Sequence, residues 1–400
     1  MSAGLIPGGG RKLKVLYSFP HALGAPGIGW TAWNQANELV RAGHEVHIVA
    51  ASVTKPVEGA ASVRTTLVLF SRRVPHRALG RDRALRLHDR LTAGIVKKVD
   101  VDVVHAWPLG SALTFEAAAR RGIPAVREVP NTHTAHAYEV VARETETLGL
   151  APRRGASHTH DARRLATEER EWAAATALLV PSEAVAQTFR DRGFEPHRLL
   201  RHQYGSNAHA QPDLRDDRPF TAVFLGRGEP RKGLHYALRA WLASTACRSG
   251  RFLVYGVLEP DYAEYLAPLL AHASVEVRGV TDDPLGALSQ GDVLLLPTVE
   301  EGSALVTYEA QIAGCVPLVS TAAGAVIDEG VTGLTHEVGD VDALTRHLDT
   351  LSQNTDVLRA MRDAALAAAD DLTWTAAARR QVDAYLAAIA LTDESRRAAA

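Results

Sequence analysis

Two short segments carry charged side chains whose spacing suits the binding of an anionic ligand. The first, "GRGEPRKG" (226–233), places Arg227 and Lys232 in a turn rich in Gly and Pro that follows an apolar segment and opens a helix. Two cations at a helix N-terminus oppose the helix dipole, so this placement is unfavourable unless an anion lies between them. A diphosphate would meet that need through charge-assisted hydrogen bonds. The alternative is a solvated basic loop.

The second segment, "EEGSALVTYEAQIAGCVPLVS" (300–320), carries two carboxylates on either side of small residues. Glu301 and Glu309 lie about two helical turns apart, which excludes a compact carboxylate pair and favours two separate contacts to one long ligand. Gly302, Ser303 and Ala304 between them would let the backbone approach a ligand closely. The alternative is a helix cap at Glu301 and a hydrogen-bonded Glu309, because a Glu within an apolar helix needs a partner.

Other candidates are weaker. Gly27 and Gly29, in "GAPGIGW", stand at an expected helix start, where a Gly-rich turn can hold an anion. His105 lies near the end of one expected strand, and His133 and His136 follow another. The pair "HTH" at 158 and 160 has the spacing of metal ligands but no third ligand nearby, so it indicates a polar loop.

Short apolar segments that alternate with helical patterns predict the elements that position these residues. The first half predicts strands at 12–19, 45–50, 101–106, 124–129 and 177–182, with a helix at 30–43 that Gly43 ends. The second half predicts strands at 220–226, 251–256, 275–279, 292–297 and 316–320. This alternation is typical of α/β domains with doubly wound parallel sheets. Ligands of such sheets bind beyond the carboxyl ends of the strands, where both charged segments fall.

Composition bounds the class of protein. The 400 residues, 46% of them hydrophobic, favour two domains, and a polar, aperiodic stretch at 205–219 is the expected linker. The net charge of −2 with scattered Arg and Lys argues against nucleic acid as a partner. Two cysteines, Cys247 and Cys315, predict no disulfide and favour the cytoplasm. Residues 1–11 are expected to be a flexible leader, and no segment is long enough to be a transmembrane span. Peripheral membrane contact stays open.

The paired motifs resemble a known family. "GRGEPRKG", followed by "EEGSALVTYEAQIAGCVPLVS", is similar to the signature of the retaining, nucleotide-sugar-dependent glycosyltransferases of family 4, which have the GT-B fold. "AGHEVHIVA", "DVVHA", "VPSEAVAQTFRDRGF" and "GVTGLTHEVGDVDAL" resemble the same family. The resemblance implies an acceptor-binding domain at 1–204, the linker at 205–219, a nucleotide-sugar-binding domain at 220–373, and a C-terminal helix and tail at 374–400 that return to the first domain.

The resemblance also implies roles for individual residues. Arg227 and Lys232 would hold the donor diphosphate, and Glu309 would bind the ribose. Glu301 would face the transferred sugar, and the loop from Gly302 would present the backbone N–H groups of Ala304, Leu305 and Val306. Gly27 and Gly29 would close the diphosphate site, and His133 would lie near the donor sugar. The family usually has an aromatic residue and Gly where this chain has Ser303 and Ala304, so we expect a reshaped sugar pocket.

The expected activity is transfer of a sugar from a UDP- or GDP-sugar to the hydroxyl of an unknown sugar, lipid or small-molecule acceptor. The catalytic residues would be Glu301, His133, Arg227 and Lys232. No cofactor and no metal are expected, because cationic side chains can neutralise a leaving diphosphate. Two alternatives remain: a nucleotide-sugar epimerase or hydrolase of the same fold, and a non-catalytic nucleotide-sugar-binding protein. Comparing the fate of the donor with and without an acceptor would separate them.

Overall fold

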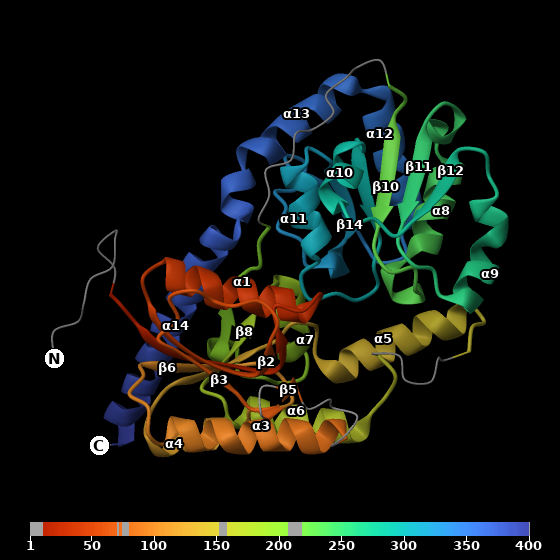
Figure 1. The fold of residues 1–400 in the computed structure, drawn as a ribbon. Coiled ribbons are helices and arrows are strands. Elements are labelled where there is room, and N and C mark those ends of the chain that lie inside the picture. Colours follow the sequence, from red (N-terminus) through yellow and green to blue (C-terminus); the bar gives the residue numbers. More distant parts are fainter. Residues whose placement is uncertain (1–10, 70–71, 74–79, 152–157, 207–217, 400) are drawn as a thin grey trace.

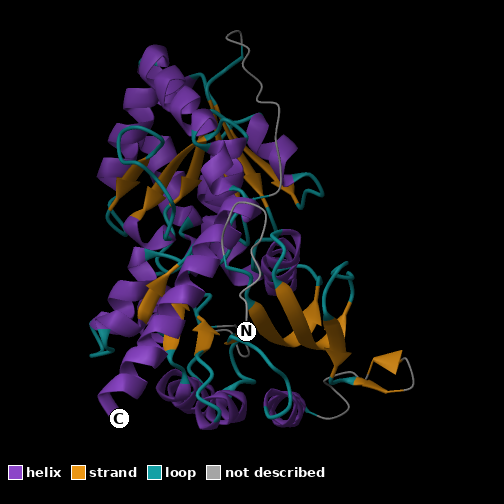
Figure 2. Cartoon of the chain, turned by 90° about the vertical axis from the view of Figure 1, so that its left-hand side faces the viewer, coloured by secondary structure: helices purple, strands orange, loops and turns teal. Residues whose placement is uncertain are grey.

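The chain folds into two α/β domains, one above the other in Figure 1. The computed structural model describes residues 11–69, 72–73, 80–151, 158–206 and 218–399. In each domain a parallel sheet lies between helices (Figure 2). The predicted class, two doubly wound Rossmann-like domains, is confirmed.

The first domain is built on a parallel sheet of seven strands in the order β3-β2-β1-β6-β7-β8-β9. Its strands are β1 (Lys14–Leu23), β2 (Glu45–Val53), β3 (Ser62–Thr65), β6 (Val103–Ala106), β7 (Ala125–Glu128), β8 (Ala177–Val180) and β9 (Leu199–Arg201). The five predicted strands are present. The sequence did not predict β3 and β9, which lie at the two edges and are short; β3 is largely exposed, so it lacks an apolar pattern. A separate two-stranded ribbon joins β4 (Val68–Leu69) and β5 (Arg72–Arg73).

Among the residues that the structure describes, six helices belong to the first half of the chain. They are α1 (Ile28–Arg41), α3 (Arg81–Val96), α4 (Ala112–Arg120), α5 (Thr134–Thr147), α6 (Ala162–Ala174) and α7 (Glu183–Arg190). A 3-10 turn, η1 (Pro196–Arg198), precedes β9. Helix α1 begins two residues earlier than predicted and ends just before Gly43, whose φ of 91° needs a residue without a Cβ.

The second domain has a parallel sheet of six strands in the order β12-β11-β10-β13-β14-β15. Its strands are β10 (Thr221–Leu225), β11 (Arg251–Tyr255), β12 (Val275–Gly279), β13 (Val293–Leu296), β14 (Val316–Ser320) and β15 (Leu334–His336). The sequence predicted all but β15, which has three residues and is mostly half-buried. Its helices are α8 (Leu234–Ala243), α9 (Pro260–Leu270), α10 (Pro284–Ser289), α11 (Leu305–Ile312), α12 (Val341–Gln353) and α13 (Thr355–Ala367). Four 3-10 turns complete it: η2 (Pro230–Lys232), η3 (Thr245–Arg248), η4 (Thr321–Ala323) and η5 (Ala369–Leu372).

The last helix, α14 (Trp374–Ala399), returns to the first domain, as predicted. Its Tyr385 is fully buried in the same cluster as Tyr17 and Val103 of the first sheet. The Tyr385 hydroxyl lies 2.6 Å from Nδ1 of His105 on β6. Figure 1 shows this blue helix beside the first sheet, although it follows the whole second domain in the sequence.

The chain crosses between the domains twice, and the two crossings touch. Most of the predicted linker, 207–217, lies outside the described residues, but Ser206 forms an isolated parallel bridge with Thr373. The amide of Ser206 donates to the carbonyl of Leu372 at 2.8 Å, and the amide of Trp374 donates back to Ser206 at 3.3 Å. Both crossings therefore form one connection.

Helix α5 also joins the domains. Its Glu144 carboxylate lies 2.8 Å from Nε2 of His235 on α8 and accepts a hydrogen bond of 3.1 Å from the Tyr236 hydroxyl. Leu148, just beyond α5, packs in the core of the second domain. Both cysteines are free, as expected from the sequence. Among the helices in the described residues, none has the length and apolar character needed to cross a membrane.

Candidate active site

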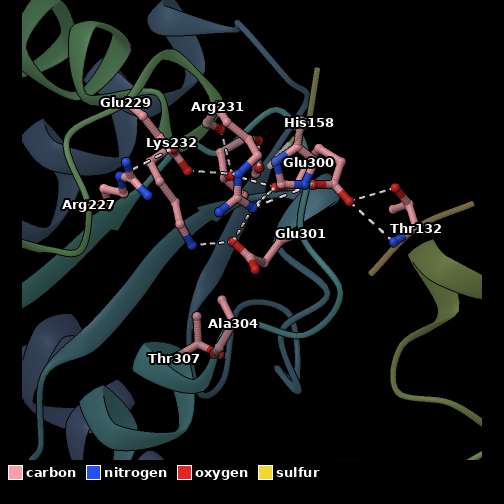
Figure 3. Close-up of polar contacts among 12 residues, drawn as sticks. Thr132, His158, Arg227, Glu229, Arg231, Lys232, Glu300, Glu301, Ala304 and Thr307 are labelled. Atoms are coloured by element: carbon pink, nitrogen blue, oxygen red, sulfur yellow. Dashed lines mark hydrogen bonds and ion pairs between the residues drawn. The ribbon is translucent and has the colours of Figure 1, made fainter. Parts of the chain in front are cut away.

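The two charged segments meet, as Figure 3 shows. The motif after β10 forms η2 and leads into α8, and the loop after β13 leads into α11. Because β10 and β13 are neighbouring parallel strands, their carboxyl ends open at one edge of the sheet. There the Lys232 ammonium forms an ion pair with the Glu301 carboxylate. Lys232 is only 14% exposed, so this part of the motif is not a solvated loop.

Arg227 lies at a more open position. Its side chain is 58% exposed and faces two acids, Glu259 at 3.1 Å and Glu229 at 3.7 Å. The motif therefore contains one sheltered cation, Lys232, and one exposed cation, Arg227. An exposed guanidinium retains rotamer freedom, so Arg227 can turn toward a ligand at low free-energy cost.

A third cation of the same motif, Arg231, is the most enclosed. Its guanidinium is 2.9 Å from Glu229, 3.0 Å from Glu301 and 3.4 Å from Glu300. Burial lowers the pKa of Arg231, but the neighbouring carboxylates outweigh burial and raise it overall. Sequence reasoning treated this position as a spacer and missed it. Its only signal was a third basic residue within the turn.

The cations keep Glu301 ionised. Burial alone would raise the pKa of the Glu301 carboxyl, but Arg231 and Lys232 lower it below its ordinary value. An ionised carboxylate can only accept hydrogen bonds. Glu301 is therefore suited to bind hydroxyl or ammonium groups and unsuited to give up a proton.

The N-terminus of α11 offers two backbone donors. The amide of Ala304 donates to the carbonyl of Ala323 at 3.1 Å, so it is already satisfied. In the described part of the chain, the amides of Leu305 and Val306 donate to no protein acceptor. Two free amides at a helix N-terminus can bind an anion. Of the three amides implied by the resemblance, these two are open.

The small residues before α11 serve the protein as much as a ligand. The Ser303 hydroxyl is buried and bonded to the Tyr308 hydroxyl at 2.8 Å and to the Gly324 carbonyl at 2.9 Å. A Cβ on Gly302 would stand 1.8 Å from the Pro130 carbonyl oxygen of the first domain. Gly302 thus permits the close approach of the first domain to this loop.

Glu309 is the carboxylate that the sequence places on an apolar helix, where it needs a partner. It is half-buried on α11, and burial raises the pKa of its carboxyl. Among the described residues its carboxylate has no hydrogen-bond or ion-pair partner. The capping alternative required a hydrogen-bonded Glu309, and the structure shows none.

Gly27 and Gly29 stand at the start of α1, as predicted. Gly27 has a φ of 79° and open space where a Cβ would lie. Gly29 is required by its own domain, because a Cβ there would stand 2.4 Å from the Ala22 carbonyl oxygen. Only Gly27 therefore leaves space beside the backbone.

His133 lies against the aromatic core of the first domain. Its ring packs against Trp172 and Phe189, with ring centroids 4.6 and 5.0 Å away, inside the first domain. Its Nδ1 accepts the Ala135 amide and caps α5. Burial, chiefly, lowers its pKa to about 4. His136, one turn further, is half-buried. Burial, chiefly, lowers the pKa of His136, and the nearby charge of Glu300 opposes this shift.

Glu300 was not predicted at all, yet it joins the two domains. One carboxylate oxygen accepts from the Thr132 hydroxyl at 2.6 Å and from the Thr132 amide at 3.2 Å. The other lies 3.3 Å from Nε2 of His158 and 3.4 Å from Arg231. His158, expected in a polar loop, is thus a partner of this carboxylate. No group of three or more His, Cys, Asp or Glu in the described residues could hold a metal ion.

Comparisons with known proteins match both halves of the chain. A family model described as "Glycosyltransferase Family 4" matches residues 26–200, and one described as "Glycosyl transferases group 1" matches residues 219–354. The two models together span both α/β domains, so the chain carries the two domains of a family 4 type glycosyltransferase, with the GT-B fold.

Two curated relatives and several solved structures are similar. The D-inositol 3-phosphate glycosyltransferases of Streptomyces coelicolor and Streptomyces griseus are 34% and 31% identical over 143 and 198 residues, or 34% and 44% of this chain. These matches span 30% and 41% of the relatives' length. The structure of Anabaena HepE in complex with UDP has a TM-score of 0.65, and the lipopolysaccharide outer core galactosyltransferase WaaB has 0.67. Each is 14% identical, covers 93% and 94% of this chain and 99% of its own, and shows the fold alone.

Proposed function

We propose that this glycosyltransferase moves a sugar from a nucleotide diphosphate sugar to an acceptor hydroxyl, with retention of anomeric configuration and without a metal. The observation that carries the proposal is the meeting of Lys232, Arg231 and Glu301 beside the open amides of α11. Cations and free amides suit a diphosphate, and an acceptor-only carboxylate suits the hydroxyls of a sugar.

The nucleotide end of the donor would extend toward Glu309. Its carboxylate lacks a protein partner in the described residues, and the two hydroxyls of a ribose would supply one. We favour UDP as the nucleotide over GDP, since HepE, which shares the fold, was solved with UDP and with UDP-glucose. The acceptor remains a sugar, lipid or small molecule that carries a free hydroxyl.

The same-face mechanism fits the environment of Glu301 better than a double displacement does. A double displacement needs a carboxylate that is free to attack carbon. Glu301 is held by two cations and accepts hydrogen bonds instead. The leaving phosphate would then take the proton of the acceptor hydroxyl while Lys232 neutralises the growing charge.

The test is to incubate the protein with UDP-glucose and with GDP-linked sugars, with and without an acceptor extract, in EDTA. We expect acceptor-dependent release of nucleotide diphosphate and a product whose anomeric coupling, read by proton NMR, matches that of the donor. Re-faced or hydrolysed donor without an acceptor would favour the epimerase or hydrolase alternative. Turnover that EDTA abolishes and Mg²⁺ restores would overturn metal independence, and inverted coupling would overturn retention.

A further inference from the structure

The Glu300 carboxylate connects the two halves of the cleft through separate oxygens. Its Oε1 faces Thr132, in the loop after β7 of the first domain, through both the hydroxyl and the amide. Its Oε2 faces Arg231, in η2 of the second domain, and His158 of the first (Figure 3). One side chain therefore contacts both domains at once.

Burial makes this connection demanding. Glu300 is fully buried, and its charge is stable there only while every partner is in place, because an unpaired buried carboxylate is strongly destabilising. Burial raises the pKa of the Glu300 carboxyl, but His158 and Arg231 outweigh burial and lower it to about 2. A small rotation of one domain would break several of these contacts together.

The connection leads directly to the proposed site. The same Nη1 of Arg231 that faces Glu300 at 3.4 Å also donates to Glu301 at 3.0 Å. Arg231 further donates to the Glu300 backbone carbonyl at 2.9 Å. Thr132 is therefore linked to Glu301 through Glu300 and Arg231.

We propose that Glu300 is a positioning residue for the transfer reaction, which holds Thr132 of the first domain against the Arg231–Glu301 pair of the second. Glu300 acts through its neighbours and does not touch the reacting atoms. The inference rests on the proposed function, because it assigns Glu300 a part in that reaction.

Three variants isolate the connection. Glu300→Gln keeps the size of the side chain and an oxygen for Thr132 but removes the charge that faces Arg231. Thr132→Val replaces the hydroxyl with a methyl group, and Thr132→Ser keeps the hydroxyl. The control is Tyr236→Phe, which removes a different hydrogen bond between the domains, the one to Glu144, and leaves the ring in place.

The expected result separates turnover from binding. Glu300→Gln and Thr132→Val should lower kcat by about tenfold to 10²-fold, since a small misplacement of a positioning group has effects of this size. Their affinities for UDP should stay near wild type. The double variant should lose little more than Glu300→Gln alone, because both changes break one network. Thr132→Ser should retain most of the wild-type kcat, and Tyr236→Phe should have the kcat of wild type.

Hydrogen exchange gives a readout that needs no activity. In Glu300→Gln, a first-domain peptide covering residues 129–137 should exchange faster, because the Thr132 amide loses an ionised acceptor across the domain boundary. Tyr236→Phe should leave the exchange of this peptide unchanged.

Additive losses of kcat in the double variant, unchanged kcat in Glu300→Gln, or unchanged exchange in Glu300→Gln would each overturn the inference. If Glu300→Gln fails to fold, Thr132→Val decides by kcat. Wild type without transfer activity would overturn the proposed function, and the exchange result would then decide the Glu300 connection alone.

Discussion

Lys232 and Glu301 form an ion pair that is sheltered from water. A diphosphate would therefore meet a Lys232 ammonium that is held in place and partly neutralised by Glu301. As the glycosidic bond breaks, negative charge grows on the leaving diphosphate, and a preorganised cation stabilises it most in the transition state. The value of Lys232 to the reaction is therefore expected to appear in turnover more than in binding.

Lys232→Ala should lower kcat by about 10²–10³-fold with a smaller loss of UDP affinity, by analogy with the removal of one oxyanion-hole donor. Arg227→Ala should have the same sign and a smaller effect, because Arg227 is more exposed. Steady-state kinetics and calorimetry with UDP check both. Lys97→Ala, at the exposed end of α3, is the matched control. Near wild-type turnover in Lys232→Ala would make the basic turn a structural feature only.

Stability should fall in acid because of Glu300. Its pKa is depressed in the folded protein, from 4.5 to about 2, so its contribution is present above pH 4.5 and is lost as the pH falls toward 2. The difference corresponds to on the order of 3 kcal/mol of unfolding free energy at most. Urea unfolding at pH 7 and pH 3 checks this. Glu300→Gln should flatten the dependence, and an equally steep loss in that variant would assign the effect to other carboxylates.

His133→Ala should destabilise the protein, whatever it does to the sugar. The change removes a buried ring between Trp172 and Phe189 and the cap of α5. The cap alone is worth about 1 kcal/mol. His133→Asn keeps a capping side chain and should lose less. Thermal unfolding measures both variants, and unchanged melting temperatures would mean that the ring is not part of the core. The role of His133 near a donor sugar stays a prediction.

Charge and spacing predicted the parts of the site that belong to one segment each. Lys232 and Glu309 stood out because two cations at a helix start and an acid within an apolar helix are locally unfavourable. Glu300, Thr132 and Arg231 could not be found in this way. Their importance comes from packing between segments 168 and 69 residues apart, which no local pattern encodes.

At the scale of elements, the packing of α14 likewise could not be predicted from a local pattern. The sequence indicated a helix, and only the family resemblance indicated which domain it covers. Apolar runs predicted the central strands, whereas β3, β9 and β15 escaped because short edge strands carry too few buried residues to show a pattern.

The contact of α14 with the first sheet can be weighed with one atom. In Tyr385→Phe the hydroxyl that is bonded to His105 and Gln381 is lost at a fully buried position. We expect a loss of about 1–3 kcal/mol of unfolding free energy, because buried partners are left unsatisfied. Denaturant titration measures it. Leu386→Ala, at an exposed neighbouring position, should be close to neutral. A neutral Tyr385→Phe would show that water replaces the hydroxyl.

At the scale of the whole molecule, Gly302 controls how closely the domains meet. A Cβ in Gly302→Ala would collide with the Pro130 carbonyl and push the first domain away. We expect a larger radius of gyration by X-ray scattering and a strong loss of turnover, while each domain keeps its fold by circular dichroism. Gly94→Ala, in open space on α3, is the control. Unchanged scattering with retained turnover would mean that the loops move apart without separating the domains.

The bridge between Ser206 and Thr373 has a consequence for protein engineering. The donor-binding unit leaves and re-enters the first domain at adjacent points, so it resembles an insertion within a longer unit that includes α14. A chimaera that takes its donor preference from another enzyme should therefore exchange residues 221–372 and leave 374–399 with the host. A single cut in the linker would instead separate the first domain from the helix that completes its core.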